Sequence, residues 1–145
     1  MNNHQWVYPI TLVPDDGGFV VQCRDVPEAI TQGEDRPAAL EAAEGALQAA
    51  MEIRIKEREA IPLPSKPKSG EVSVALPMTT AMKATLYWAM QEKGLNQSTL
   101  ARQLNINEKE VRRMLDPHHP SKATTLEHAL HHLGKRVVLG IESLE

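Results

Sequence analysis

The sequence is poor in cysteine and in aromatic residues, and it contains no long apolar run. Its single cysteine, Cys23, excludes an internal disulfide framework and a multi-cysteine metal site. No apolar run approaches the roughly 18–20 residues that are needed to cross a bilayer. Met1 to Gln5 lack the basic start and the apolar stretch of a signal peptide. We therefore expect a soluble protein of a reducing cytoplasm.

Charge is distributed unevenly along the 145 residues, which are enough for one medium domain or two small ones. Residues 1–76 carry 7 basic and 12 acidic side chains, whereas residues 77–145 carry 9 basic and 7 acidic ones. Five of the six histidines also lie in the second half. The opposite signs indicate different partners: a basic or neutral surface for the first half and a polyanion for the second.

The pattern of the first half is that of three strands. Trp6 to Pro14 alternates at period two, with the apolar side chains on one face. Asp15 to Gly18 supplies residues that tolerate positive φ in a short hairpin loop. Phe19 to Arg24 alternates as a second strand, and a third lies around Ala29 to Gln32. A three-stranded meander is predicted.

A helix and a fourth strand complete this half. Asp35 is a candidate N-cap, and an apolar stripe recurs after it at helical spacing, at Leu40, Ala43, Leu47, Met51 and Ile55. Three prolines in residues 61–70 predict an extended connector. Residues 71–76 then alternate as a strand that returns to the first sheet. We predict an α+β domain of residues 1–76 with the order β-β-β-α-β.

Residues 77–145 predict an all-α domain that ends in a short strand. Thr79 is a candidate cap for the first helix, and Gly94 is a candidate terminator for it. Thr124, with Glu127 three residues later, has the spacing of a capping box for the last helix. The apolar residues of 137–141 are predicted to form the short terminal strand.

The most specific signal lies in residues 97–115. Two short helices, Gln97 to Leu104 and Glu108 to about Leu115, are separated by Asn105-Ile106-Asn107. Asn105 occupies a position that requires left-handed φ, and Ala101 lies at a helix crossing that tolerates only a small side chain. This constellation resembles the helix-turn-helix of phage-repressor-type regulators.

The polar positions of this motif are candidates for contact with DNA. An Arg bonds two acceptors on guanine, an Asn pairs with adenine, and a Lys meets a phosphate or a base. Candidates on or next to the second helix are Asn107, Lys109, Arg112 and Arg113. Gln97 and Ser98 begin the preceding helix and can donate to a phosphate. A soluble helical hairpin with a polar outer face is the alternative. Two acids near these positions weaken binding by a single copy, so we expect a dimer or a higher homo-oligomer.

The first 76 residues resemble the HicB antitoxin family of bacterial toxin–antitoxin systems, and the likeness extends to the helix-turn-helix tail that one branch of the family carries. The matching segments are Tyr8-Pro9-Ile10, Asp16-Gly17-Gly18-Phe19, Asp25-Val26-Pro27-Glu28-Ala29, Thr31-Gln32-Gly33 and Ile61-Pro62-Leu63-Pro64. The resemblance implies a partial ribonuclease-H-like domain that binds and covers a HicA-type mRNA-cleaving toxin. It also implies a tail that represses the operon's own promoter as a dimer.

Catalysis and metal binding are both weakly supported. Ribonuclease H chemistry needs several carboxylates around two metal ions, one of them usually in the middle of the first strand, whereas Val7 to Val13 contains no acid. His128 and His132 have a zinc-compatible spacing, but no Cys or carboxylate completes the set. We expect no enzyme activity, no metal and no cofactor, and we interpret the histidines as surface or interhelical residues.

Two alternatives to the antitoxin hypothesis remain at this stage. One is a stand-alone transcription regulator whose first domain senses a ligand or builds the oligomer. The other is a metal-dependent nuclease. The sequence does not identify the toxin-contacting residues.

Overall fold

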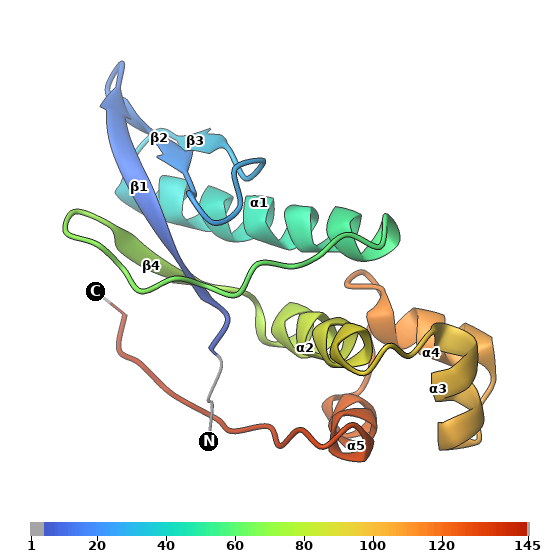
Figure 1. Cartoon of the computed structure of the whole chain (residues 1–145). Helices are drawn as coiled ribbons and strands as arrows, with labels where there is room; N and C mark the ends of the chain where they lie inside the picture. Colours follow the sequence, from blue (N-terminus) through green and yellow to red (C-terminus); the bar gives the residue numbers. More distant parts are fainter. Residues whose placement is uncertain (1–4, 145) are drawn as a thin grey trace.

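The computed structural model describes residues 5–144, which form four strands and five helices (Figure 1). The strands are β1 (Val7–Asp15), β2 (Gly18–Gln22), β3 (Thr31–Gly33) and β4 (Val72–Ala75). They form one antiparallel sheet in the order β3-β2-β1-β4, and α1 (Arg36–Lys56) covers one face of it. The predicted α+β class and the β-β-β-α-β order are confirmed.

Alternation along β1 decides which face of the sheet is buried. Tyr8 and Ile10 are fully buried and lie opposite Val74 and Val72 of β4. Val13, whose side chain points to the opposite face of the same strand, is exposed. Because side chains of a strand point alternately to opposite faces, one face carries the apolar set and takes the helix. The other face is covered at Pro9, which is buried, and becomes exposed towards the hairpin end of the strand.

Helix α1 begins and packs as the sequence predicts. The Asp35 carboxylate accepts a hydrogen bond from the backbone N–H of Ala38 at 2.9 Å, which caps the first turn. The predicted stripe is buried at Ala43, Leu47 and Met51 and only partly buried at its first member, Leu40.

Gly33 sets the distance between the sheet and the start of α1. A Cβ atom at this position would lie 2.3 Å from the backbone nitrogen of Ala39. No side chain fits in that space, so the close approach of β3 to the helix requires glycine here.

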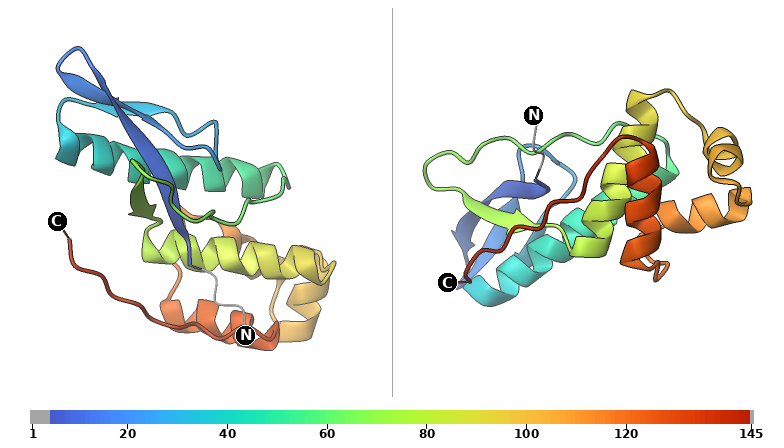
Figure 2. Two further views of the ribbon diagram at one scale, coloured as in Figure 1. Left: turned by 60° about the vertical axis from the view of Figure 1, so that its left-hand side comes forward. Right: turned by 90° about the horizontal axis from the view of Figure 1, so that it is seen from below.

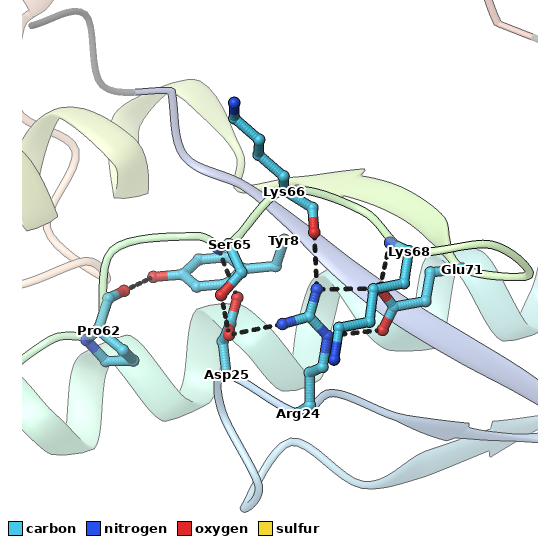
Figure 3. A network of polar contacts seen from close by, with 8 residues as sticks. All are labelled: Tyr8, Arg24, Asp25, Pro62, Ser65, Lys66, Lys68 and Glu71. Atoms are coloured by element: carbon cyan, nitrogen blue, oxygen red, sulfur yellow. Dashed lines mark hydrogen bonds and ion pairs between the residues drawn. The ribbon is translucent and has the colours of Figure 1, made fainter.

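The connector between α1 and β4 is extended, as predicted, and side chains of the sheet domain fix it (Figure 3). The Tyr8 hydroxyl donates to the carbonyl oxygen of Pro62 at 2.6 Å. The Asp25 carboxylate accepts from the backbone N–H and the hydroxyl of Ser65 at 2.7 and 2.6 Å. Burial of Tyr8 raises the pKa of its hydroxyl well above the ordinary value.

Arg24 holds the far end of the connector. Its guanidinium donates to the carbonyl oxygen of Lys66 at 2.7 Å and pairs with the Glu71 carboxylate at 2.9 Å (Figure 3). The bond from Arg24 lowers the pKa of the Glu71 carboxyl below its usual range. The three-proline segment is therefore a fixed strap and not a loose linker.

The remaining helices are α2 (Met78–Glu92), α3 (Gln97–Leu104), α4 (Glu108–Leu115) and α5 (Ala123–His132). Two of the predicted caps are wrong. Helix α2 begins after Pro77 and α5 after Lys122, so Thr79 and Thr124 lie inside the first turns and neither caps by its side chain. A cap needs extended backbone, and here Pro77 and Lys122 have it.

The predicted terminal strand is also wrong for the single chain. Residues 135–144 have no regular secondary structure and pair with no strand among the described residues. A strand needs a neighbour for its backbone groups, and this segment leaves α5 as an extended trace without one (Figure 1).

The two halves of the chain share one hydrophobic core. Helix α2 packs against α1 on one side and against α4 and α5 on the other (Figure 2). The Trp6 indole N–H donates to the Thr85 hydroxyl at 2.6 Å, and the Tyr87 hydroxyl donates to the carbonyl oxygen of Glu59 at 2.7 Å. Buried side chains from Trp6 to Leu133 belong to a single cluster. Packing is thus continuous across residues 76 and 77.

Candidate nucleic-acid interface

Three asparagines shape the α3–α4 pair. Asn96 accepts from the backbone N–H of Thr99 at 2.8 Å and caps α3. Asn105 ends α3 with φ 56° and ψ 44°, the left-handed conformation that the sequence predicts there. Asn107 accepts from the backbone N–H of Glu110 at 2.9 Å and caps α4. Both helix ranges and the left-handed conformation of Asn105 agree with the sequence analysis.

Small and apolar side chains lock the two helices together. Leu100 and Ala101 of α3 and Val111, Met114 and Leu115 of α4 are buried in the shared core. Ala101 is 4% exposed, in keeping with a crossing that leaves no room for a larger side chain. The pair is therefore a rigid platform and not a loose hairpin.

The outer face of α4 presents three cationic side chains. Lys109, Arg112 and Arg113 are exposed and form no ion pair with any residue of the range 5–144. Two acids of the first turn, Glu108 and Glu110, lie on the same short helix. Helical geometry puts Lys109 and Arg113 one turn apart on a single side, with Arg112 flanking them.

The other three predicted contact residues, two at the start of α3 and one at the start of α4, differ from one another in exposure and in hydrogen bonding. Ser98 is exposed and Gln97 is half-buried, and both lie in the first turn of α3. The side-chain oxygen of Asn107 is occupied by the capping bond. Pairing with adenine uses both the oxygen and the nitrogen of an Asn side chain. With the cap in place, Asn107 still offers its amide nitrogen as a donor to an outside partner, and the capping bond fixes the orientation of the amide.

Positive charge continues from α4 onto the neighbouring segment. An open groove of about 580 Å³ runs along α4 and α5 and is lined by Arg113, Lys122, His119 and His128, among others. Sequence reasoning missed Lys122, because nothing in its local pattern distinguishes it from any other exposed lysine.

A buried lysine of α2, also missed by the sequence analysis, holds the end of α4. Lys83 is fully buried, and its ammonium donates to the backbone carbonyls of Arg113, Asp116 and His119 at 2.8, 2.6 and 2.8 Å, with the Ser121 hydroxyl oxygen also 2.9 Å away. Burial lowers the pKa of Lys83 to about 8. A positive charge at the C-terminal end of α4 also complements the helix dipole.

Comparison with known proteins identifies the family to which the chain belongs. The family described as HicB_like antitoxin of bacterial toxin-antitoxin system matches residues 7–85. "Antitoxin HicB" of Escherichia coli (strain K12) is 37% identical over 133 residues, which are 91% of this chain and 96% of that protein. The chain belongs to the HicB antitoxin family.

Other HicB proteins show the same coverage. "Antitoxin HicB 1" of Photorhabdus laumondii is 37% identical over 93% of this chain and 86% of its own length. "Antitoxin HicB" of Pseudomonas fluorescens is 30% identical over 94% of each chain. The similarity therefore includes the α3–α4 pair as well as the sheet.

Membership of the HicB family answers the question of catalysis. HicB antitoxins are not enzymes, and neither is this chain. The acid of β1 is its last residue, Asp15, which is exposed at the hairpin end and not in the middle of the strand. Within residues 5–144, no group of three or more His, Cys, Asp or Glu side chains is placed to hold a metal ion.

Two histidines of this HicB protein, His118 and His132, contact other polar side chains. His132 shares a hydrogen bond of 2.8 Å with Gln103, and His118 lies 2.6 Å from the Glu52 carboxylate of α1. These contacts agree with the interpretation of surface or interhelical histidines. In the part of the chain that the structure describes, no helix combines the length and the apolar character needed to cross a membrane.

Proposed function

We propose that this HicB protein neutralises a HicA-type mRNA-cleaving toxin through residues 1–76 and represses its own operon by binding operator DNA through residues 77–145. Family membership over nearly the whole chain supports the first activity. Lys109, Arg112 and Arg113, which are exposed, form no ion pair within residues 5–144 and lie on a rigid α3–α4 pair, support the second. Cytoplasmic location follows from a partner that cleaves mRNA.

The toxin-binding half is suited to a basic partner. Residues 1–76 carry a net charge of −5, and exposed carboxylates such as Glu34, Glu41 and Glu44 lie at the start of α1 or just before it. A toxin that binds RNA has a basic surface, so an acidic inhibitor gains both long-range attraction and competition with the RNA. The four-stranded sheet with one covering helix is consistent with a partial ribonuclease-H-like fold.

The DNA-binding half is proposed to act as a helix-turn-helix. Arg112, Arg113 and Lys109 contact bases and phosphates of the major groove from α4, while Gln97 and Ser98 contact a phosphate from the start of α3. Asn107 contributes through its free amide nitrogen and through the cap. A single short helix with two acids binds weakly, so the repressor is a homodimer or a higher oligomer that spans two half-sites.

Binding to its own upstream DNA tests the repressor activity. The double variant Arg112→Ala/Arg113→Ala is expected to lose operator binding in a mobility-shift titration and to keep toxin neutralisation. A matched control, Lys56→Ala/Lys66→Ala, removes two exposed cations from the first half and is expected to bind the operator normally. Normal operator binding by the arginine variant contradicts the proposed interface.

Co-purification with its genetic neighbour tests the antitoxin activity. Expression with the adjacent small basic reading frame is expected to give a stable complex and to restore growth. The rival, a stand-alone regulator with a ligand-sensing first domain, predicts no such complex and an operator shift that depends on a small ligand alone.

A further inference from the structure

The last described residues form the most exposed apolar segment of the chain. Val138, Leu139 and Ile141 are 70, 76 and 91% exposed, and Val137 and Leu144 are exposed as well. The backbone of this segment has no strand partner among residues 5–144. Exposed β-branched and aliphatic residues on an unpaired extended chain are the features of a surface that another chain covers.

The start of the segment is fixed to the helices. The Lys135 ammonium pairs with the Glu92 carboxylate at 2.9 Å and lies 4.5 Å from the centre of the Trp88 ring. The backbone N–H of Lys135 also donates to the carbonyl oxygen of Leu130 at 2.9 Å. The tail therefore leaves the body of the protein from a defined point beside α2 and α5.

The sequence of the tail is complementary to itself in one antiparallel register. When two copies pair with Leu139 opposite Leu139, Val137 lies opposite Ile141 and Arg136 lies opposite Glu142. Directly opposite residues share a face, so Val137, Leu139 and Ile141 of both copies make one apolar face. The two Arg136–Glu142 pairs fall on the other face. Moving the register by two residues puts Arg136 opposite Gly140 or Leu144 and removes both ion pairs.

We infer that residues 135–143 of two copies pair as antiparallel strands around Leu139 and that this two-stranded ribbon forms the dimer. The inference rests on the proposed function, which requires two copies on the operator, and it names the segment that joins them. A twofold axis through Leu139 makes the contact self-complementary and closed. A ribbon of two strands is marginal by itself, so its apolar face needs a further surface of the dimer to cover it.

Charge reversal tests the register in the full-length protein by sedimentation equilibrium. Arg136→Glu and Glu142→Arg each put two like-charged pairs into the ribbon, and each is expected to raise the dimer dissociation constant about tenfold or more. The double variant, and an equimolar mixture of the two single variants, restore opposite charges and are expected to restore the dimer. Glu127→Arg on the exposed side of α5 is the matched control and is expected to leave the dimer unchanged. Single variants that dimerise normally, or a mixture that stays monomeric, would overturn the inference.

Cysteine cross-linking gives an independent test. Leu139→Cys puts two thiols opposite each other at the axis, and mild oxidation is expected to give a covalent dimer. Val137→Cys is the control, because its thiols lie about four residues apart along the ribbon, beyond the reach of a disulfide. The native Cys23 is buried and common to both variants. Equal cross-linking of the two variants, or none at position 139, would contradict the register.

Both readouts are independent of toxin and DNA. If the wild-type protein is dimeric but insensitive to the tail variants, the ribbon is refuted while the proposed repressor survives with another dimer surface. If wild-type protein is monomeric at micromolar concentration, the ribbon is refuted as well, and operator titration then decides separately on the proposed function.

Discussion

The Lys83 ammonium lies 2.8 Å from the backbone carbonyl oxygen of Arg113. This bond joins the helix that packs on α1 to the last turn of the helix that carries the proposed DNA contacts. The same ammonium donates to two further carbonyls of the chain that follows α4. One side chain therefore fixes where α4 ends and how the next segment turns toward α5.

Replacing Lys83 by methionine is expected to lower the free energy of unfolding by about 2 to 4 kcal/mol, because it leaves buried carbonyls without a donor. Operator affinity should fall as well, since the end of α4 loses its anchor. Urea unfolding and a mobility-shift titration measure the two effects. Lys93→Met, at an exposed position after α2, is the matched control. A Lys83→Met protein of wild-type stability would show that the contacts do not hold the helix.

Substitution of Asn107 separates capping from base recognition. Asn107→Ala removes the bond to Glu110 and is expected to cost about 1 kcal/mol of stability. Asn107→Ser keeps a side-chain oxygen for the cap and removes only the amide nitrogen. We expect the serine variant to match the wild type in thermal unfolding and to bind the operator less tightly. Unchanged operator affinity in the serine variant would restrict Asn107 to the cap.

Stability at alkaline pH tests the environment of Tyr8. Its pKa in the folded chain lies above the ordinary value of 10, so the unfolded chain loses the phenolic proton first and stability falls as the pH rises above about 10. Tyr8→Phe is expected to be about 1 kcal/mol less stable at pH 7, since the bond to Pro62 is lost. Its deficit should shrink as the pH rises. A constant difference from pH 7 to 11 would refute the raised pKa.

Two truncated chains test the proposed division of labour. A fragment of residues 1–76 lacks Thr85 and exposes Trp6 together with the flank of α1 that α2 covers. A fragment of residues 1–94 keeps these contacts, and we expect it to unfold at a higher temperature and to retain toxin binding. The family match, which extends to residue 85 inside α2, points the same way. Equal thermal stability of the two fragments would show that α2 contributes nothing to the first half.

Local chemistry made the α3–α4 pair predictable. Asn96, Asn105 and Asn107 act within a few residues of their own position, by capping or by a left-handed φ, so a single sequence contains the whole signal. The strands of the first half were predictable for the same reason, since alternation and a hairpin loop are local patterns. Bounds moved by one or two residues because strand ends depend on the partner.

Features that depend on distant contacts were not predictable. Lys83 lies 30 or more residues from its acceptors, and an isolated lysine in a helix pattern gives no sign that it is buried. Thr79 and Thr124 have the composition of caps, but Pro77 and Lys122 adopt the extended backbone instead. Apolar alternation at the C-terminal end predicted a strand, but residues 135–144 pair with no strand among the described residues, and a local pattern does not show where a partner strand is.

Helix α2 has a consequence for how toxin and operator influence each other. Helix α2 packs on both α1 and α4 and connects them rigidly. Under the proposed function, a toxin bound to the sheet would therefore stay at a fixed position relative to α4. Under the proposed function, bound toxin would alter operator occupancy through its bulk and charge beside the duplex, or by bridging neighbouring repressors. Because the two halves share one core, this arrangement does not involve a hinge motion of one half relative to the other.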